Sequence, residues 1–146
     1  MRLTLYTDYA LRVLIYLGVR GDDGERATIT EIAERYAISR NHVMKVVYQL
    51  GKLGYIETVR GKGGGLRMQM RPEDINVGVL VRQTEADMAI VECFSSSGRC
   101  RLAPDCRLQG MLKEALDAFM DVLDRYTLAD ILDNRQSLRQ MLGVTT

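Results

Sequence analysis

All three cysteines of the 146-residue chain lie in one short segment, ECFSSSGRCRLAPDCRL, at residues 92–108. Six residues separate Cys93 from Cys100 and five separate Cys100 from Cys106, in a stretch rich in Ser, Gly and Pro that is typical of a loop. Thiolates are nucleophiles and ligands for soft metals, so such a loop can bind a metal or react with an oxidant. Because the chain has no cysteine elsewhere, the clustering argues against incidental buried residues.

Three kinds of site fit thiols at this spacing. Two cysteines can form a reversible disulfide while the third stays free. A structural zinc ion is a second option, but zinc sites usually contain closely spaced cysteine pairs, which this chain lacks. An iron–sulfur cluster is the third, because its irons take thiolate ligands from a loop able to wrap around it. The spacing alone leaves these options open.

The bulk composition is that of an ordinary globular protein, with 47% hydrophobic and 27% charged residues. The length fits one domain, or a small domain with an oligomerising extension. No apolar run approaches the roughly 20 residues needed to span a bilayer. The apolar start contains Asp8 and Arg12, which argues against a signal peptide. We therefore expect a cytoplasmic protein without a membrane partner, whose thiols are kept reduced.

Charge divides the chain into two unequal halves. Residues 1–72 contain 12 Lys and Arg against 7 Asp and Glu, a net charge of +5, whereas residues 73–146 have a net charge of −4. This asymmetry indicates a polyanion, such as nucleic acid, as the partner of the first half.

The first half has the pattern of a helix-turn-helix. Apolar residues from Ala10 to Leu17 recur at helical spacing, with Thr7 as the expected N-cap, and a turn is expected at 21–26. Thr28 and Glu31 form a capping box that starts a second helix ending near Tyr36. Ser39 is then the expected cap of a third helix, whose Val43, Val46, Val47 and Leu50 face inward.

The polar face of this third helix is suited to DNA. Arginine pairs with guanine, and asparagine or glutamine with adenine, in the major groove. A plain helical hairpin with a polar face is the alternative for this segment. The expected DNA-binding residues here are Thr28, Ser39, Arg40, Asn41, His42, Lys45, Tyr48 and Gln49.

A second basic element follows at YIETVRGKGGGLRMQM, which reads as two short strands around a glycine-rich turn. The turn lacks the pattern of a nucleotide-binding loop and precedes a strand, whereas such loops open a helix. A hairpin wing beside the helix-turn-helix explains it better, with Arg60, Lys62, Gly63, Gly64 and Arg67 as expected DNA contacts.

The second half is expected to form a short helix after Pro72, the cysteine loop, and a long helix over 107–126. The apolar stripe of the long helix exceeds what so small a domain can cover, so we expect a homodimer, with intramolecular packing as the alternative. The predicted fold is mainly α: a winged helix-turn-helix at 1–72, a linker helix and cysteine loop at 73–106, and a dimerisation helix and tail at 107–146.

An enzyme is not expected. The chain contains a single His, and no Ser/His/Asp, Cys/His or paired-carboxylate arrangement is evident. A small iron–sulfur electron-transfer protein is the rival from another class, but it would need neither a recognition helix nor a basic wing.

The chain resembles the iron–sulfur winged-helix repressors that include the NsrR and IscR regulators. The resemblance covers nearly the whole length and rests on LTLYTDYALRVLIYL, ISRNHVMKVVYQLGKLGYIETVRGKGGGLRM, the three cysteines and DRYTLADIL. Gln109 stands where the IscR branch has a histidine, and SRNHVMKV and YTLADI resemble the nitric-oxide-sensing NsrR branch.

The resemblance implies a dimeric repressor that binds double-stranded promoter DNA and releases it when nitric oxide attacks its cluster. It implies Cys93, Cys100 and Cys106 as ligands of a [4Fe–4S] or [2Fe–2S] cluster. Asp8 is the implied fourth ligand, supplied by the second chain, with Glu85 and Glu92 as further candidates. The alternative for Asp8 is a structural role, as a carboxylate in the first turn of a helix, where the helix dipole favours it. A regulator of the same build that senses iron supply or redox state is the alternative.

Overall fold

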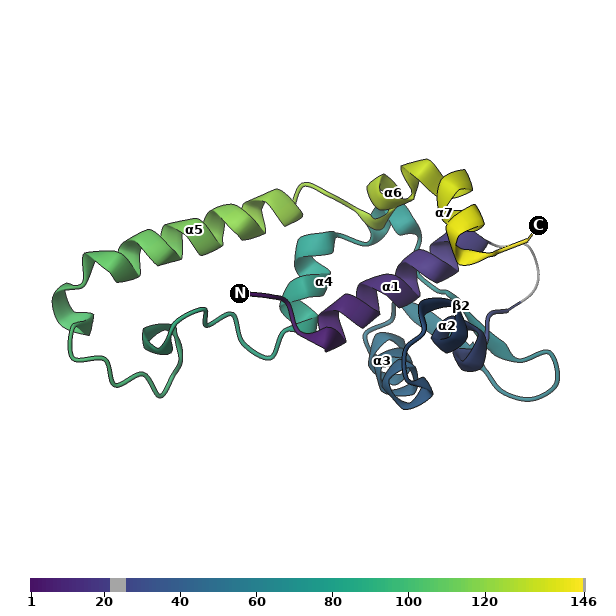
Figure 1. The fold of residues 1–146 in the computed structure, drawn as a ribbon, viewed down its shortest axis with the longest axis horizontal. Coiled ribbons are helices and arrows are strands. Elements are labelled where there is room, and N and C mark those ends of the chain that lie inside the picture. Colours follow the sequence, from purple (N-terminus) through teal and green to yellow (C-terminus); the bar gives the residue numbers. More distant parts are fainter. Residues whose placement is uncertain (22–25, 146) are drawn as a thin grey trace.

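The structure is a computed structural model that describes residues 1–21 and 26–145. The helices are α1 (Leu5–Arg20), α2 (Ile29–Tyr36), α3 (Arg40–Lys52), α4 (Val77–Thr84), α5 (Arg107–Leu123), α6 (Leu128–Ile131) and α7 (Arg135–Leu142). The strands are β1 (Ile56–Val59) and β2 (Gly65–Met68), and short 3-10 turns lie at Pro72–Asp74, Glu92–Phe94, Ala103–Asp105 and Leu132–Asn134. The predicted winged helix with a long later helix is confirmed (Figure 1). The turn predicted at 21–26 lies mostly outside the described residues.

Helix α1 begins earlier than the sequence pattern indicates. Thr4 has an extended backbone, and its hydroxyl accepts a hydrogen bond from the Thr7 amide at 3.3 Å. The prediction that Thr7 is the N-cap is therefore wrong. The Thr7 side chain is fully buried, and its hydroxyl donates to the Thr84 hydroxyl on α4 at 2.9 Å. Asp8 lies in the first turn, where the positive end of the helix dipole stabilises its negative charge.

The helix-turn-helix forms as its caps predict. Thr28 and Glu31 make the full capping box at the start of α2, and Ala37 turns the chain with a left-handed backbone at φ +52°. Ser39 is the N-cap of α3, although its side chain makes no capping hydrogen bond within the described residues.

The wing is a two-stranded antiparallel hairpin. Ile56 pairs with Met68 and Val59 with Gly65, so the glycine-rich turn lies at the tip. Gly64 has no room for a side chain, because a Cβ atom there would lie 2.3 Å from the Val59 carbonyl oxygen. The close approach of backbone to backbone explains why glycine occupies this position.

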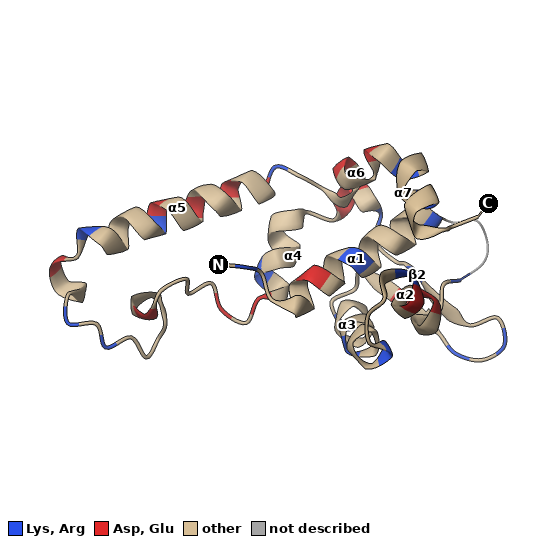
Figure 2. Cartoon of the chain, in the orientation of Figure 1, with Lys and Arg blue, Asp and Glu red and all other residues tan. Residues whose placement is uncertain are grey.

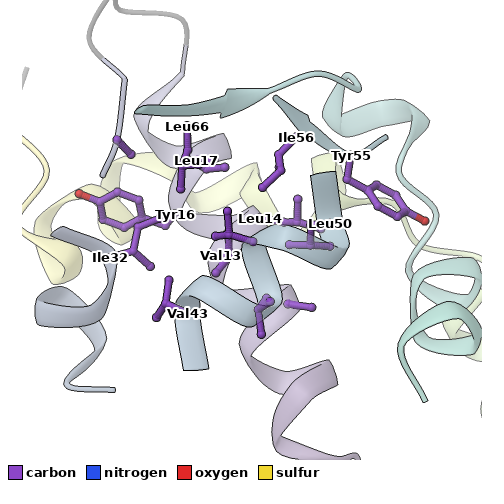
Figure 3. Packing of buried hydrophobic residues seen from close by; sticks show 14 of the residues in the cluster. Val13, Leu14, Tyr16, Leu17, Ile32, Val43, Leu50, Tyr55, Ile56 and Leu66 are labelled. Carbon is purple, nitrogen blue, oxygen red and sulfur yellow. The ribbon is translucent and has the colours of Figure 1, made fainter. Parts of the chain in front are cut away.

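One hydrophobic core joins both ends of the chain around α1. Figure 3 shows Val13, Leu14 and Leu17 of α1 facing Ile32 of α2, Val43 and Leu50 of α3, and Ile56 and Leu66 of the hairpin. Leu128, Leu132 and Leu142 from the end of the chain pack into the same core. The C-terminal segment therefore returns to the helix-turn-helix, after the long helix has left it.

Helix α5 lies apart from this core (Figure 1). Its one buried residue is Met120, which packs in a small cluster with Val77 and Val81 of α4. Among the described residues, no helix combines the length and the apolar character that crossing a membrane requires.

Glu31 fixes the start of α2 to α1. Its carboxylate accepts hydrogen bonds from the Tyr16 hydroxyl at 2.5 Å and from the Arg20 guanidinium, in addition to its capping role. Partial burial acts to raise the pKa of Glu31, but the hydrogen bond from Tyr16 and the charge of Arg20 outweigh it and lower the pKa. The ionised carboxylate therefore stabilises the folded state.

We expect Glu31→Gln to reduce the free energy of unfolding at neutral pH by about 1–2 kcal/mol, because the charged acceptor of these bonds is lost. In the parent, this contribution is present above the ordinary pKa of glutamate and is lost as pH falls through the lowered value. The variant should therefore show a weaker dependence of stability on acid pH in urea unfolding. Glu34→Gln, at an exposed position of the same helix, is the control. Equal loss in both variants would contradict the role of Glu31.

Candidate nucleic-acid interface and cysteine site

Helix α3 presents the predicted polar face to solvent. Burial of Val43, Val46, Val47 and Leu50 against the core turns the opposite side of the helix outward. All the residues predicted from this region for DNA contact are exposed, namely Thr28, Ser39, Arg40, Asn41, His42, Lys45, Tyr48 and Gln49. The face therefore offers hydrogen-bond donors, acceptors and positive charge together.

Aromatic rings contact this face at both ends of α3. The Tyr9 ring of α1 lies 5.9 Å from the His42 ring, and Arg12 lies 5.8 Å from the ring centre of Tyr9. At the other end of α3, Lys52 lies 5.4 Å from the ring centre of Tyr48, which is 67% exposed. Tyr9 was missed by sequence reasoning, because its helical position gives no sign that it reaches the neighbouring helix.

The wing carries positive charge at its tip (Figure 2). Arg60, Lys62 and Gly63 are exposed, whereas Gly64 is half-buried. Arg67 is exposed too, but it pairs with Glu57 across the hairpin at 2.6 Å, which offsets part of its charge.

Arg26 is a cation at the wing that sequence reasoning missed. Its guanidinium donates to the Gly63 carbonyl at 2.9 Å and so ties the segment before α2 to the tip. Arg26 directly precedes Ala27, which pairs with Leu66 beside the hairpin. The Ala27–Leu66 pairing joins residues 39 positions apart, so no local sequence pattern predicts it.

The cysteine segment lies alongside α5, away from the helix-turn-helix (Figure 1). Cys93, Cys100 and Cys106 are free thiols, each half-buried. Cys93 and Cys106 line a cavity of about 770 Å³ between the loop and the first turns of α5, with apolar walls that include Phe94 and Leu116.

The donor chemistry and the cavity fit an iron–sulfur cluster, but the thiols are not gathered into a complete ligand set. Cys100 is not among the residues lining the cavity. Over residues 1–21 and 26–145, no three His, Cys, Asp or Glu side chains lie close enough to hold a metal ion. A complete site therefore needs a further donor and a closer approach of Cys100.

Asp8, the predicted fourth ligand, is paired with Arg12. A hydrogen bond of 3.1 Å and an ion-pair contact of 2.9 Å join the guanidinium to the carboxylate, and the Asp8 side chain is 40% exposed. Within one chain, Asp8 does not join the cysteines. It is accessible to another chain.

The start of α1 is nevertheless tied to the root of the cysteine loop. Glu85, the residue after α4, accepts hydrogen bonds from the Thr4 amide at 2.8 Å and the Thr4 hydroxyl at 3.0 Å. One turn further along, Thr7 donates to Thr84, which itself donates to the Leu80 carbonyl at 2.9 Å. Both bonds from Thr4 end on one carboxylate oxygen, Oε1, of Glu85, which is one of the two further candidates for the fourth ligand. The other candidate, Glu92, is exposed beside Cys93.

Comparison with known proteins identifies the family. The model of the Rrf2 family, described as iron-dependent transcriptional regulators, matches residues 3–134. The chain belongs to the Rrf2 family. The HTH-type transcriptional regulator NsrR of Geobacillus kaustophilus is 54% identical over 143 residues, which are 97% of each chain. The NsrR regulator of Bacillus subtilis is 53% identical with the same coverage.

A solved structure shares the fold. The T. potens IscR structure superimposes with a TM-score of 0.72 at 25% sequence identity, covering 92% of this chain and 88% of that one. This Rrf2 chain is a transcriptional regulator of the NsrR type and not an enzyme, as predicted. The individual DNA contacts and cluster ligands within the family fold stay predictions.

The buried bond between Thr7 and Thr84 generates a testable expectation for this Rrf2 chain. Thr84→Val removes the acceptor of a buried hydroxyl and should lower the free energy of unfolding by about 1–2 kcal/mol. Thr84→Ser keeps the hydroxyl and is the matched control. In a double-mutant cycle, adding Thr7→Val should cost less than it does alone, because both partners are then removed. Additive losses in thermal unfolding would show that the two hydroxyls do not interact.

Proposed function

We propose that the chain is a dimeric repressor that binds promoter DNA and senses nitric oxide through an iron–sulfur cluster held by Cys93, Cys100 and Cys106. The observation that carries the proposal is the placement of three free thiols on the single segment joining α4 to α5. Two of them line one cavity, in a chain 54% identical to a regulator named NsrR.

The DNA-binding part of the proposal rests on exposure and charge. The polar face of α3 would enter the major groove, since its exposed side chains can donate to phosphates and to base edges. Arg60 and Lys62 at the wing tip would approach a neighbouring phosphate or the minor groove. In this proposal residues 1–72 read DNA, residues 73–106 carry the cysteines, and residues 107–146 supply the dimerisation helix and tail.

The dimer part of the proposal rests on the uncovered apolar stripe of α5. Leu108 and Met111 are 59% and 62% exposed, and Phe119 and Val122 are 37% and 42% exposed. Leaving such a stripe in water is unfavourable, and the same helix of a second copy would cover it by two-fold symmetry. Two recognition helices would then address the two halves of a palindromic site.

Three thiolates from one chain and Asp8 from the second copy would complete the ligand set. A carboxylate oxygen is a weaker ligand for iron than a thiolate, so this position would be the labile one. Asp8 would have to leave Arg12, whose guanidinium also lies 5.8 Å from the ring centres of Tyr9 and Tyr36. When bound, a [4Fe–4S] or [2Fe–2S] cluster would supply iron that reacts with nitric oxide.

The residues around Asp8 offer a path from this site to α3. A change in the partner of Asp8 alters the charge beside Arg12, and Tyr9 next to it contacts His42 on the recognition helix. A tenfold change in DNA affinity needs only about 1.4 kcal/mol. Small shifts at two or three polar contacts are therefore sufficient.

Lys62→Ala tests the wing. The variant should bind all duplexes several-fold more weakly, and the dependence of log affinity on log salt should become shallower by about two for the dimer, one per lost phosphate contact. Fluorescence anisotropy over a salt series measures both. Arg135→Ala removes one positive charge from an exposed position of α7, outside the predicted DNA-binding residues, and is the control. A change confined to which sequence is preferred would contradict a phosphate contact.

Nitric oxide sensitivity tests the proposal as a whole. The chain, purified without oxygen, should contain iron and sulfide, and nitric oxide should weaken its binding to a selected duplex by about tenfold or more. Cys100→Ser should lose both the iron and the response. Ser97→Ala, in the same loop, is the matched control and should keep both.

Oxygen and an iron chelator serve as competing signals in the same assay, because the family is described as iron-dependent. Loss of binding at the lowest dose identifies the signal, and a chelator acting before nitric oxide would favour sensing of iron supply. An iron-free protein that binds the duplex fully and ignores nitric oxide would contradict the proposed function.

A further inference from the structure

The beginning of α4 and the end of α5 are joined by a pair of backbone hydrogen bonds. The Val77 amide donates to the Tyr126 carbonyl at 3.0 Å, and the Leu128 amide donates to the Ile75 carbonyl at 2.9 Å. Asn76 and Thr127 form the antiparallel bridge between these bonds. We call residues 75–79 and 124–128, together with Arg82, the interhelical joint.

Side chains reinforce the joint at Asp124, the C-cap of α5. Arg82 of α4 binds its carboxylate with two hydrogen bonds, of 2.5 and 2.8 Å, and the Asn76 amide group donates to its carbonyl at 2.7 Å. A Cβ atom on Gly78 would lie 1.8 Å from an Asp124 carboxylate oxygen, so the close approach requires glycine.

Asp124 is not explained by the stability of α5 itself. A negative charge at the C-terminal end of a helix opposes the helix dipole. The carboxylate is charged at neutral pH, and the hydrogen bond from Arg82 lowers the pKa of Asp124 further. The residue therefore serves the contact between the helices.

Because α5 is long, a small change of angle at the joint moves the far end of the helix by several ångströms. The helix has 17 residues and is about 25 Å long, and it is buried only at Met120, near the joint. A rotation of about 8° over this length displaces the far end by about 3.5 Å, which is close to the rise of one DNA base pair. The joint thus determines where α5 points relative to the helix-turn-helix.

We infer that Arg82, Gly78 and Asp124 are positioning residues that fix the spacing between the two half-sites that the dimer accepts. The inference rests on the proposed function, because it requires two copies paired through α5 on one DNA duplex. The half-site sequence is read by α3, on another part of the molecule, so spacing and sequence are set by separate residues.

The test uses the 146-residue chain purified without oxygen. The parent chain first enriches DNA duplexes from a random-sequence pool. The central spacer of the best duplex is lengthened or shortened by one base pair. We expect the parent to lose affinity by about tenfold on these altered duplexes, and Asp124→Asn and Arg82→Gln to lose only about threefold or less. Base preference within each half-site should not change.

Asp74→Asn is the matched control, since it removes one carboxylate from the exposed pair with Arg71 and should keep the parent spacing preference. Gly78→Ala displaces Asp124 by steric contact and should shift the preferred spacing without removing a charge. Thermal unfolding confirms that each variant is folded. Asp124→Asn preserves side-chain size at a half-buried position, and Arg82→Gln shortens an exposed side chain, so both remain informative if Gly78→Ala fails to fold.

Joint variants that bind with the parent's spacing preference would overturn the inference while leaving the proposed function intact. A parent chain that enriches no duplex, or that binds as a monomer to a single half-site, would instead contradict the proposed function itself.

Discussion

The burial of α1 is the constraint on which the rest of the molecule depends. The helix is covered by α2, α3 and the hairpin on some sides and by the C-terminal residues Leu128, Leu132 and Leu142 on others. Gly18 shows how close this packing is, because a Cβ atom there would lie 2.5 Å from a methyl carbon of Leu132. A helix so enclosed cannot rotate without disturbing both layers, since interiors are packed to crystal-like density. The backbone at Asp8 and Tyr9, on its first turns, consequently has a fixed position relative to α3, whereas their side chains are partly exposed.

Helix α5 is under the opposite constraint. It has an apolar stripe but little protein to cover it, whereas the segments before and after it, α4 and α6–α7, are held against the core. A second copy is the simplest source of the missing cover in the proposed dimer. The chain would then contain one rigid body that reads DNA and one projecting helix that pairs, and α4 lies between them. The beginning of α4 is fixed by the joint with Asp124, and the end of α4 is fixed by the hydrogen bonds from Thr4 and Thr7.

Most of the local structure was predictable from the sequence, because it depends on short-range chemistry. The capping box of Thr28 and Glu31, the inward stripe of α3 and the glycine-rich hairpin tip all reflect neighbours within a few residues. Thr7 was misassigned as an N-cap because a threonine before an apolar run carries the same signal whether it caps a helix or bonds to another one. The Tyr9–His42 contact and the Arg26–Gly63 bond join residues 33 and 37 positions apart, so no periodicity reveals them.

The cysteine site shows the limit of sequence reasoning most clearly. Spacing predicted thiolate chemistry for this loop, but intervals of six and five residues do not specify how its thiols converge. In the structure Cys93 and Cys106 share a cavity and Cys100 does not line it. In the proposed dimer a fourth donor comes from the second chain, and no interval within one chain encodes such a contact.

The contacts that join the proposed sensor to the proposed reader are polar and partly exposed, and this choice has a physical rationale. The Asp8–Arg12, Thr4–Glu85 and Arg82–Asp124 bonds lie outside the main core. Such bonds exchange with water at a net cost of about 1 kcal/mol each, whereas uncovering one buried leucine costs several times more. A signal must shift an equilibrium between two states that are close in energy, so its path has to avoid the core. Apolar packing fixes α1 and α3 as one body, and the polar contacts around Asp8 and Asp124 are the places where the molecule can change at low cost.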